Sequence, residues 1–187
     1  AQTLDEQMRD VLQFLPGVFD QKIRKIVMNK SYRNTMEIAR YAEKLTGVKD
    51  VELLKRHGKE VVEEQFQTED AVLDEILSKA KLGEDEYETA AIITMTEAEA
   101  STLYQILKAR GEEVHYIDRN SSVFKKGLTV TTFYLAKGLE FDQVFTVWGR
   151  QPEDDLIRQA KYICATRALH ELYMYQVVTE KSRDNRE

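Results

Sequence analysis

The sequence predicts an α/β fold: a three-layer sandwich in which helices flank both faces of a mainly parallel sheet. Two observations support this prediction. Short apolar segments typical of strands alternate along the chain with amphipathic segments typical of helices. Residues 90–95 (AAIITM) form an uninterrupted apolar run, as expected of a strand buried on both faces of a parallel sheet. Alternating strands and helices build βαβ units, which place the strands parallel to one another.

The first part of the chain is predicted to contain two helices and a strand. Apolar residues within 1–15 recur at spacings of three and four, which predicts an amphipathic helix that Pro16-Gly17 ends. Residues 22–29 (KIRKIVMN) alternate well enough to form a strand. A helix is expected over 35–45, because an apolar stripe runs along it and Gly47 follows in the usual position for a helix end.

The remaining elements follow in order. Residues 51–66 hold two short extended candidates on either side of Gly58, and we interpret them as a hairpin. Thr68 opens a helix that runs to about residue 81. Thr96 caps a further helix through residue 110, whose acidic first turn and basic last turn match the helix dipole. The later elements expected are strands over 113–118, 128–133 and 143–149, a helix over about 153–167, and a strand over 171–178.

Length and composition describe one ordered domain with small additions. The 187 residues are 42% hydrophobic and 32% charged, with 8 Gly and 2 Pro, which excludes collagen-like and broadly disordered chains. The parts expected are an N-terminal helix or linker over 1–21, a main domain over 22–180 with a small insertion at about 48–88, and a frayed tail over 181–187.

Charge and cysteine content limit the partners and the compartment. The 27 basic and 33 acidic residues give a net charge of -6, so contact with nucleic acid would need a local basic patch. The single Cys164 excludes an intramolecular disulfide and favours a reduced, cytoplasmic setting. No apolar run approaches the roughly 20 residues that a membrane span needs. The 3 His have no ligand spacing between them, so no metal site is expected in this chain.

Three segments have the content of ligand-binding loops, and we expect them past the carboxyl ends of strands, where such sheets bind ligands. The first is SYRNT (31–35), between a strand and a helix. Tyr32 could stack on a base, and Arg33 could meet a phosphate at the helix N-terminus. The plain alternative is a polar helix cap beside an exposed arginine.

The second segment, 131–142, follows a strand. Gly138 permits close approach of the backbone to a ligand, and Glu140 could accept a hydrogen bond from a sugar hydroxyl beside Lys137. Thr132 and Tyr134 could contact a nucleic-acid backbone or stack on a base. The alternative is a tight turn with a surface lysine, preceded by ordinary sheet residues.

The third segment is YICATRAL (162–169), which carries Arg167 near the end of a helix whose other side is apolar. Arg167 could be an arginine placed to meet a phosphate, or only a cation that complements the helix dipole.

Taken together, the segments SYRNT, TTFYLAKGLEFDQVF and YICATRALHELYMY resemble the UvrD-like helicase superfamily. They are similar to the fourth, fifth and sixth motifs of its second RecA-like domain, over residues 22–178. This resemblance implies a RecA-like fold, one half of a P-loop NTPase-like motor. Tyr134 stands where a histidine is common, and the short segment 46–93 leaves little room for a large inserted subdomain. The residues that stand there instead, VELLKRHGKEVVEEQF followed by a helix and an acidic stretch over 83–88, most closely resemble the helicase-IV and RNA-polymerase-recycling (HelD-like) branch, in which segments like FYLAKGLEFD are familiar.

The resemblance also implies a nucleotide site. ATP with Mg²⁺ would bind between this domain and an N-terminal RecA-like domain, which would hold the metal. The residues that it assigns to the nucleotide are Tyr32 on the adenine, Arg33 on the γ-phosphate, Glu140 on the ribose with Lys137 and Gly138 nearby, and Arg167 as an arginine finger.

No G-x-x-x-x-G-K-[ST] motif occurs in the sequence, so we expect a C-terminal fragment of a longer motor that does not hydrolyse ATP alone. Two functions remain open. One is a DNA helicase or translocase module, with Thr132 and Tyr134 on single-stranded DNA. The other is the motor half of a factor that binds RNA polymerase and uses ATP to remodel or recycle it.

Overall fold

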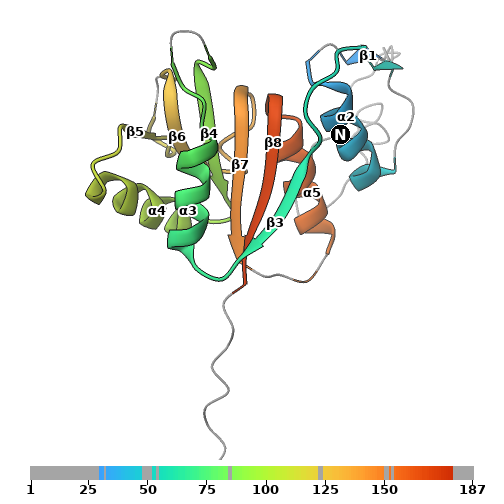
Figure 1. The fold of residues 1–187 in the computed structure, drawn as a ribbon. Helices are drawn as coiled ribbons and strands as arrows, with labels where there is room; N and C mark the ends of the chain where they lie inside the picture. The colour runs from blue at the N-terminus through green and yellow to red at the C-terminus, as the bar shows by residue number, and fades with distance from the viewer. Residues whose placement is uncertain are drawn as a thin grey trace, which may run out of the picture.

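We describe the protein from a computed structural model, which covers residues 30–31, 33–47, 52–53, 55–83, 86–121, 124–149, 152 and 154–178. Its centre is an all-parallel six-stranded sheet with the strand order β3-β8-β7-β4-β6-β5 (Figure 1). The strands are β3 (Val62–Phe66), β4 (Thr89–Thr94), β5 (Val114–Tyr116), β6 (Gly127–Thr132), β7 (Phe141–Gly149) and β8 (Ala168–Val177). A separate short parallel pair is formed by β1 (Lys30–Ser31) and β2 (Glu52–Leu53).

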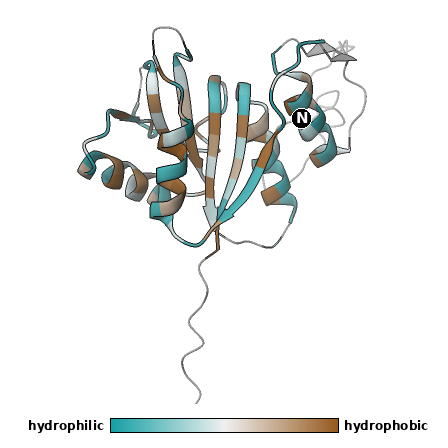
Figure 2. Cartoon of the chain, viewed as in Figure 1, coloured by the Kyte–Doolittle hydropathy of each residue, from teal (hydrophilic) through white to brown (hydrophobic). Residues whose placement is uncertain are grey.

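Four helices cover the sheet in the described part of the chain: α2 (Met36–Thr46), α3 (Glu69–Lys79), α4 (Glu97–Ala109) and α5 (Asp155–Ala165). Residues of α2 and α5 belong to the core on one face, and residues of α3 and α4 to the core on the other face. Helices α4 and α5 carry both hydrophobic and hydrophilic residues, as helices with one buried face do (Figure 2). The predicted three-layer α/β sandwich is therefore confirmed.

Strand β4 shows why the pattern predicted this architecture. All six of its residues are buried. Ala91 and Ile93 contribute to the core beneath α5, whereas Ala90 and Ile92 contribute to the core beneath α3 and α4. Successive side chains of a strand point to opposite faces, so a strand covered on both sides must be apolar throughout.

The helices begin at the capping residues that the sequence indicates. The Thr96 side chain accepts a hydrogen bond from the N–H of Glu99, and the Glu99 carboxylate accepts one from the N–H of Thr96. Thr68 and Asp154 cap α3 and α5 with one bond each: their side chains accept hydrogen bonds from the N–H groups of Ala71 and Ile157. The strands expected over 113–118, 128–133, 143–149 and 171–178 are present as β5, β6, β7 and β8. The helix expected over 1–15, the strand over 22–29 and the tail over 181–187 lie outside the described residues.

The hairpin predicted over 51–66 is wrong. Strand β2 pairs with β1, and β3 pairs in parallel with β8, with Val62 opposite Tyr173. Gly58 is not a hairpin turn, but the point at which the connecting segment passes close to Thr35. The local pattern correctly predicts extended chain in this segment. It does not predict the partner strand of β3, which lies more than a hundred residues away in the sequence. Strand β3 and α3, both within the segment 48–88 predicted as an insertion, belong to the main sheet and its cover.

No helix in the described ranges has the length and apolar content to cross a membrane.

The approach of Gly58 to Thr35 gives a stability prediction. A Cβ atom at residue 58 would lie 2.5 Å from Thr35 Cγ2 and 2.9 Å from Thr35 Cβ. Rotation about χ1 cannot move Thr35 Cβ, so the backbone must shift. We expect Gly58→Ala to lower the free energy of unfolding in urea by about 1–3 kcal/mol.

Gly83→Ala is the matched control, since an added Cβ there meets no atom within 4 Å. We expect it to change the free energy of unfolding by less than about 0.5 kcal/mol. Equal unfolding midpoints for the two variants would show that residues 35 and 58 are not in close contact.

Candidate functional site

Arg33, Glu140 and Arg167 come together at the amino-terminal edge of the central strands. Glu140 immediately precedes β7, and Arg167 immediately precedes β8. The N–H of Phe141 donates a hydrogen bond to the carbonyl of Arg167 at 2.9 Å, which fixes the two strand starts side by side. Arg33 reaches the same place from the segment before α2, and its Nε lies 2.5 Å from Glu140 Oε1.

Arg167 is the buried member of this group, with 5% of its surface exposed. One terminal nitrogen donates to the carbonyl of Leu139 at 3.1 Å, and the other donates to Thr166 Oγ1 at 3.2 Å. Its Nε is buried and has no hydrogen-bond partner within the described structure. Burial lowers the pKa of Arg167, and the nearby charge of Arg33 lowers it further, whereas Glu140 opposes both effects.

The group therefore carries a surplus of positive charge. Two guanidinium groups share one carboxylate, and guanidinium remains charged at any physiological pH. The side chains of Arg33 and Glu140 are 50% and 38% exposed, so the pair lies open to solvent. Such an edge attracts anions, and planar guanidinium groups suit phosphate or carboxylate oxygens.

The prediction that all these loops follow the carboxyl ends of strands is wrong for Glu140 and Arg167. Both lie at the amino ends, because residues 133–140 cross the sheet from the end of β6 to the start of β7. Strands β6 and β7 are both parallel to β4, so the connection between them must return to the opposite edge. Turn residues alone do not show on which edge a connection starts or ends.

The crossing segment, residues 133–140, contains residues buried against the sheet and residues near the arginine group. Phe133 and Ala136 are buried against the sheet, which holds the segment down. Lys137 Nζ lies 5.8 Å from the centre of the Tyr134 ring. Burial lowers the pKa of Lys137, and the charge of Arg167 lowers it further. Gly138 has φ of +86°, a conformation that favours glycine, and there the segment turns toward Glu140.

The residues predicted to meet nucleic acid lie at the other edge. Thr132 ends β6 opposite Thr94; it is 3% exposed, and its hydroxyl accepts a hydrogen bond from the N–H of Leu135. Tyr134 is 53% exposed at this carboxyl-terminal edge. The structure thus separates Thr132 and Tyr134 from the arginine group. Tyr32, predicted to stack on adenine, lies outside the described residues.

Sequence reasoning missed two residues that tie the arginine-bearing segments together. The Asn34 amide donates to the carbonyls of Ala165, at 3.2 Å, and Ala168, at 2.6 Å. Arg56 donates to the carbonyl of Arg33 at 2.8 Å and to that of Leu169 at 2.5 Å. Asn34 precedes a helix and resembles an ordinary cap, and no local pattern distinguishes Arg56 from a surface arginine.

It also missed Glu171, a buried carboxylate near the same edge with 3% of its surface exposed. Lys59 Nζ lies 2.8 Å from it, and hydrogen bonds come from the side chains of Tyr87, Gln143 and Tyr173. Although burial raises the pKa of Glu171, these donors lower it by more, to about 2. The network attaches the segment before β3 to β8.

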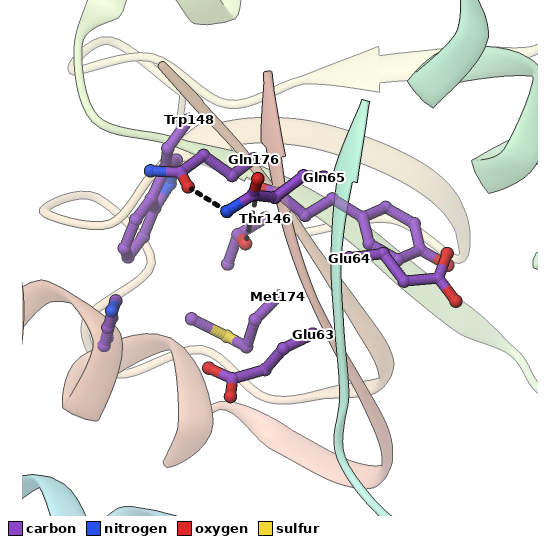
Figure 3. A pocket seen from close by; sticks show the side chains of 9 residues that line it. Glu63, Glu64, Gln65, Thr146, Trp148, Met174 and Gln176 are labelled. Atoms are coloured by element: carbon purple, nitrogen blue, oxygen red, sulfur yellow. Dashed lines mark hydrogen bonds between the residues drawn. The ribbon is translucent and has the colours of Figure 1, made fainter. Parts of the chain in front are cut away.

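A separate cavity of about 270 Å³ opens between the edge strand β3, strands β7 and β8, and α5 (Figure 3). Met174 and Trp148 contribute to its apolar part, and its charged members are Glu63, Glu64 and Lys161. None of the residues predicted as site residues lines this cavity. No group of three or more His, Cys, Asp or Glu side chains within the described ranges could hold a metal ion.

These features define the class of protein. It is a parallel α/β domain that brings two arginines and one carboxylate together at one edge of its sheet. Residues 127–175 match the family model of the UvrD-like helicase C-terminal domain. This segment of the chain is therefore similar to that domain, as the sequence predicted, and it includes Lys137, Glu140 and Arg167. Arg33 lies outside the matched segment, and the closer resemblance to the HelD-like branch stays a prediction.

A solved structure has a similar fold. The C-terminal domain of a possible DNA helicase from Lactobacillus plantarum WCFS1 is 29% identical in sequence, with a TM-score of 0.54. That match covers 80% of this chain and 91% of that chain. The arterivirus nonstructural protein 10 (helicase) in complex with DNA is 12% identical, with a TM-score of 0.39, over 64% of this chain and 29% of that chain. No curated protein matches the chain significantly.

The Glu171 network gives a prediction about pH. The folded-state pKa of about 2 lies below the ordinary value of 4.5, so ionised Glu171 stabilises the fold above pH 4.5, and this stabilisation is lost as pH falls toward 2. Glu171→Gln leaves Lys59 without its buried partner. We expect this variant to have a free energy of unfolding lower by about 3 kcal/mol at pH 7.

The pH dependence separates this effect from a general packing defect. The difference between wild type and Glu171→Gln should narrow as urea denaturation is repeated from pH 6 down to pH 2. Glu64→Gln, at an exposed position of β3, is the control and should follow the wild type throughout. A difference that stays constant with pH would contradict the account of Glu171.

Proposed function

We propose that this chain supplies one half of the ATP site of an ATP-dependent DNA helicase or translocase. Arg33, Glu140 and Arg167 would contact ATP with Mg²⁺ held by an N-terminal RecA-like domain outside this sequence. The observation that carries the proposal is the convergence of these three side chains at one edge, from segments far apart in the chain. The match of residues 127–175 to the UvrD-like helicase C-terminal domain supports it.

The hydrogen-bond donors of Arg33 and Arg167 suit a nucleoside triphosphate. Arg167 has a buried Nε without a partner, which an incoming phosphate oxygen could satisfy. Arg33 is half exposed, and its Nε lies 2.5 Å from Glu140 Oε1. When a nucleotide enters, Arg33 would exchange this carboxylate for a phosphate oxygen. Glu140 would then be free to accept hydrogen bonds from the ribose hydroxyls, with Lys137 and Gly138 beside it.

The chemistry needs a positive charge supplied from across a cleft. ATP brings a γ-phosphoryl group whose negative charge spreads over its oxygens during transfer to water. Arg167 would donate hydrogen bonds to those oxygens, and the low exposure of Arg167 strengthens the electrostatic attraction. An arginine in this role accelerates phosphoryl transfer by about 10³- to 10⁵-fold. Tyr32 would stack on the adenine.

Single-stranded DNA is the proposed partner of the opposite edge. Tyr134 is exposed there and could stack on a base, while Thr132 positions the start of the crossing segment. Residues 133–140 connect this edge to Glu140 and Arg167, so a change at one edge would move the other. RNA polymerase is the alternative partner, on the grounds of Tyr134 and the acidic balance of the chain.

The arginine assignment is tested by ATP turnover of the longer protein that contains both RecA-like domains. We expect Arg167→Ala to lower kcat by about 10³-fold. Arg158→Ala is the control, because Arg158 is on α5, the helix that precedes Arg167, and pairs with the exposed Asp155. The 187-residue chain alone should show no turnover. Turnover by this chain, abolished by Arg167→Ala, would contradict the proposal that the site is shared between two domains.

The DNA assignment is tested by strand binding and by stimulation of turnover. We expect Tyr134→Ala to weaken binding of a single-stranded oligonucleotide by about 1–3 kcal/mol, and the wild-type affinity to fall steeply with salt. Leu156→Ala, at an exposed apolar residue of α5, is the control. Turnover that responds to RNA polymerase and not to single-stranded DNA would replace the first function with the alternative.

A further inference from the structure

A short connecting segment, residues 55–59, lies against both arginine-bearing parts of the site. Within it, one terminal nitrogen of Arg56 donates to the carbonyl of Arg33 at 2.8 Å and to the carbonyl of Leu169 at 2.5 Å. Leu169 is two residues beyond Arg167, at the start of β8. Arg56 thus forms hydrogen bonds to both segments that supply guanidinium groups to the candidate site.

We propose that Arg56 is a positioning residue: it holds the segment that carries Arg33 at a fixed place relative to Arg167. The proposal of a catalytic consequence rests on the function proposed above, whereas the positioning itself does not. Arg56 has no assigned contact with nucleotide. It acts through main-chain carbonyls of the residues that would make that contact.

The two carbonyls that Arg56 contacts belong to segments that the fold holds in place to different degrees. Leu169 belongs to β8, which pairs with both β7 and β3 in the centre of one half of the sheet. Arg33 lies in a connection outside the main sheet, and its side chain is half exposed. A hydrogen bond from Arg56 therefore transmits the fixed position of β8 to Arg33. This matters most when Glu140 releases Arg33, because the side-chain pair then no longer restrains it.

Arg56 is itself held in place by its neighbours. Its carbonyl accepts a hydrogen bond from the N–H of Met36 at 2.8 Å, at the first turn of α2. The next residues, His57 and Gly58, donate to the Glu37 carboxylate at 2.8 and 2.7 Å, and these bonds lower the pKa of Glu37 to about 2. Lys59 then pairs with Glu171. The segment is attached to α2 and to β8 residue by residue.

The burial of one nitrogen of the half-buried Arg56 supports a specific role. Its Nε is buried and has no hydrogen-bond partner within the described structure, which costs free energy that a solvated surface arginine would not lose. The compensation comes from the two carbonyl contacts, and both belong to the segments of the candidate site.

The first test follows Arg33 in the 187-residue chain without nucleotide. In a chain labelled with ¹⁵N-arginine, the Arg33 Nε–H signal is identified by its change in Glu140→Gln. We expect its hydrogen exchange to become about tenfold faster or more in Arg56→Met, since the segment loses its tie to β8. Arg56→Lys, which keeps a charged donor, should give an intermediate rate. Arg40→Met, at an exposed position of α2, should leave the rate unchanged.

Wild-type exchange of the Arg33 Nε–H in a folded Arg56→Met chain overturns the proposal. If urea denaturation shows that Arg56→Met is unfolded, Arg56→Lys decides in the same way, and a wild-type exchange rate in that variant overturns it.

The second test measures ATP turnover of the longer two-domain protein. Displacement of Arg33 by a fraction of an ångström should lower kcat about 10- to 100-fold in Arg56→Met, while KM for ATP changes less than about threefold. A merely structural role would instead lower kcat in proportion to the unfolded fraction, and would be corrected by cooling. If Arg167→Ala leaves turnover unchanged, the proposed function fails, yet the exchange experiment still decides whether Arg56 positions Arg33.

Discussion

The parallel pairing of β7 and β8 at their amino ends is the constraint on which the candidate site depends. Phe141 lies opposite Ala168, and its N–H donates to the carbonyl of Arg167. This register places Glu140 and Arg167, the residues just before the two strands, beside each other. The strands are buried on both faces, so a shift of register by one residue would exchange the side chains that pack into the two cores and is strongly disfavoured. The packing of the sheet core thus determines the positions of Glu140 and Arg167.

The segment 133–140 gives this site a physical connection to the far edge of the sheet. It begins beside Thr132 and the exposed Tyr134, lies over one face through the buried Phe133 and Ala136, and ends at Glu140. Packed segments transmit displacement because they are dense and close to incompressible. A ligand that moves Tyr134 would therefore move Glu140 and its partner arginine. Under the proposed function, this connection would link the edge proposed to bind DNA with the edge proposed to bind ATP.

Glu171 and Arg167 are two buried charged residues near the amino-terminal edge of the sheet. They differ in how completely their polar atoms are hydrogen-bonded. Glu171 is surrounded by a lysine, two tyrosine hydroxyls and an amide, so its ionised form is favoured despite burial. Arg167 has a carbonyl and a hydroxyl as partners, lies near a second guanidinium group, and retains a buried nitrogen that no described residue contacts by a hydrogen bond. A buried charge whose partners are complete is costly to disturb, whereas a buried nitrogen without a partner costs free energy that a new partner can recover. Glu171 therefore helps to hold the fold together, and Arg167 is the one of the two that we propose to contact a ligand.

The sequence by itself determined the α/β layers, the helix starts at Thr68 and Thr96, and the residue types of the candidate site, because hydrophobic period, capping and motif content are local properties. Tertiary structure alone decided which strands pair, and this is why residues 51–66 do not form a hairpin and β3 joins β8 instead. It also decided that Glu140 and Arg167 meet at the amino edge, and that Arg56 bridges Arg33 and Leu169. These features depend on contacts between segments separated by many residues. The periodicity of the sequence is a local property, so it does not predict which distant backbone group a side chain contacts.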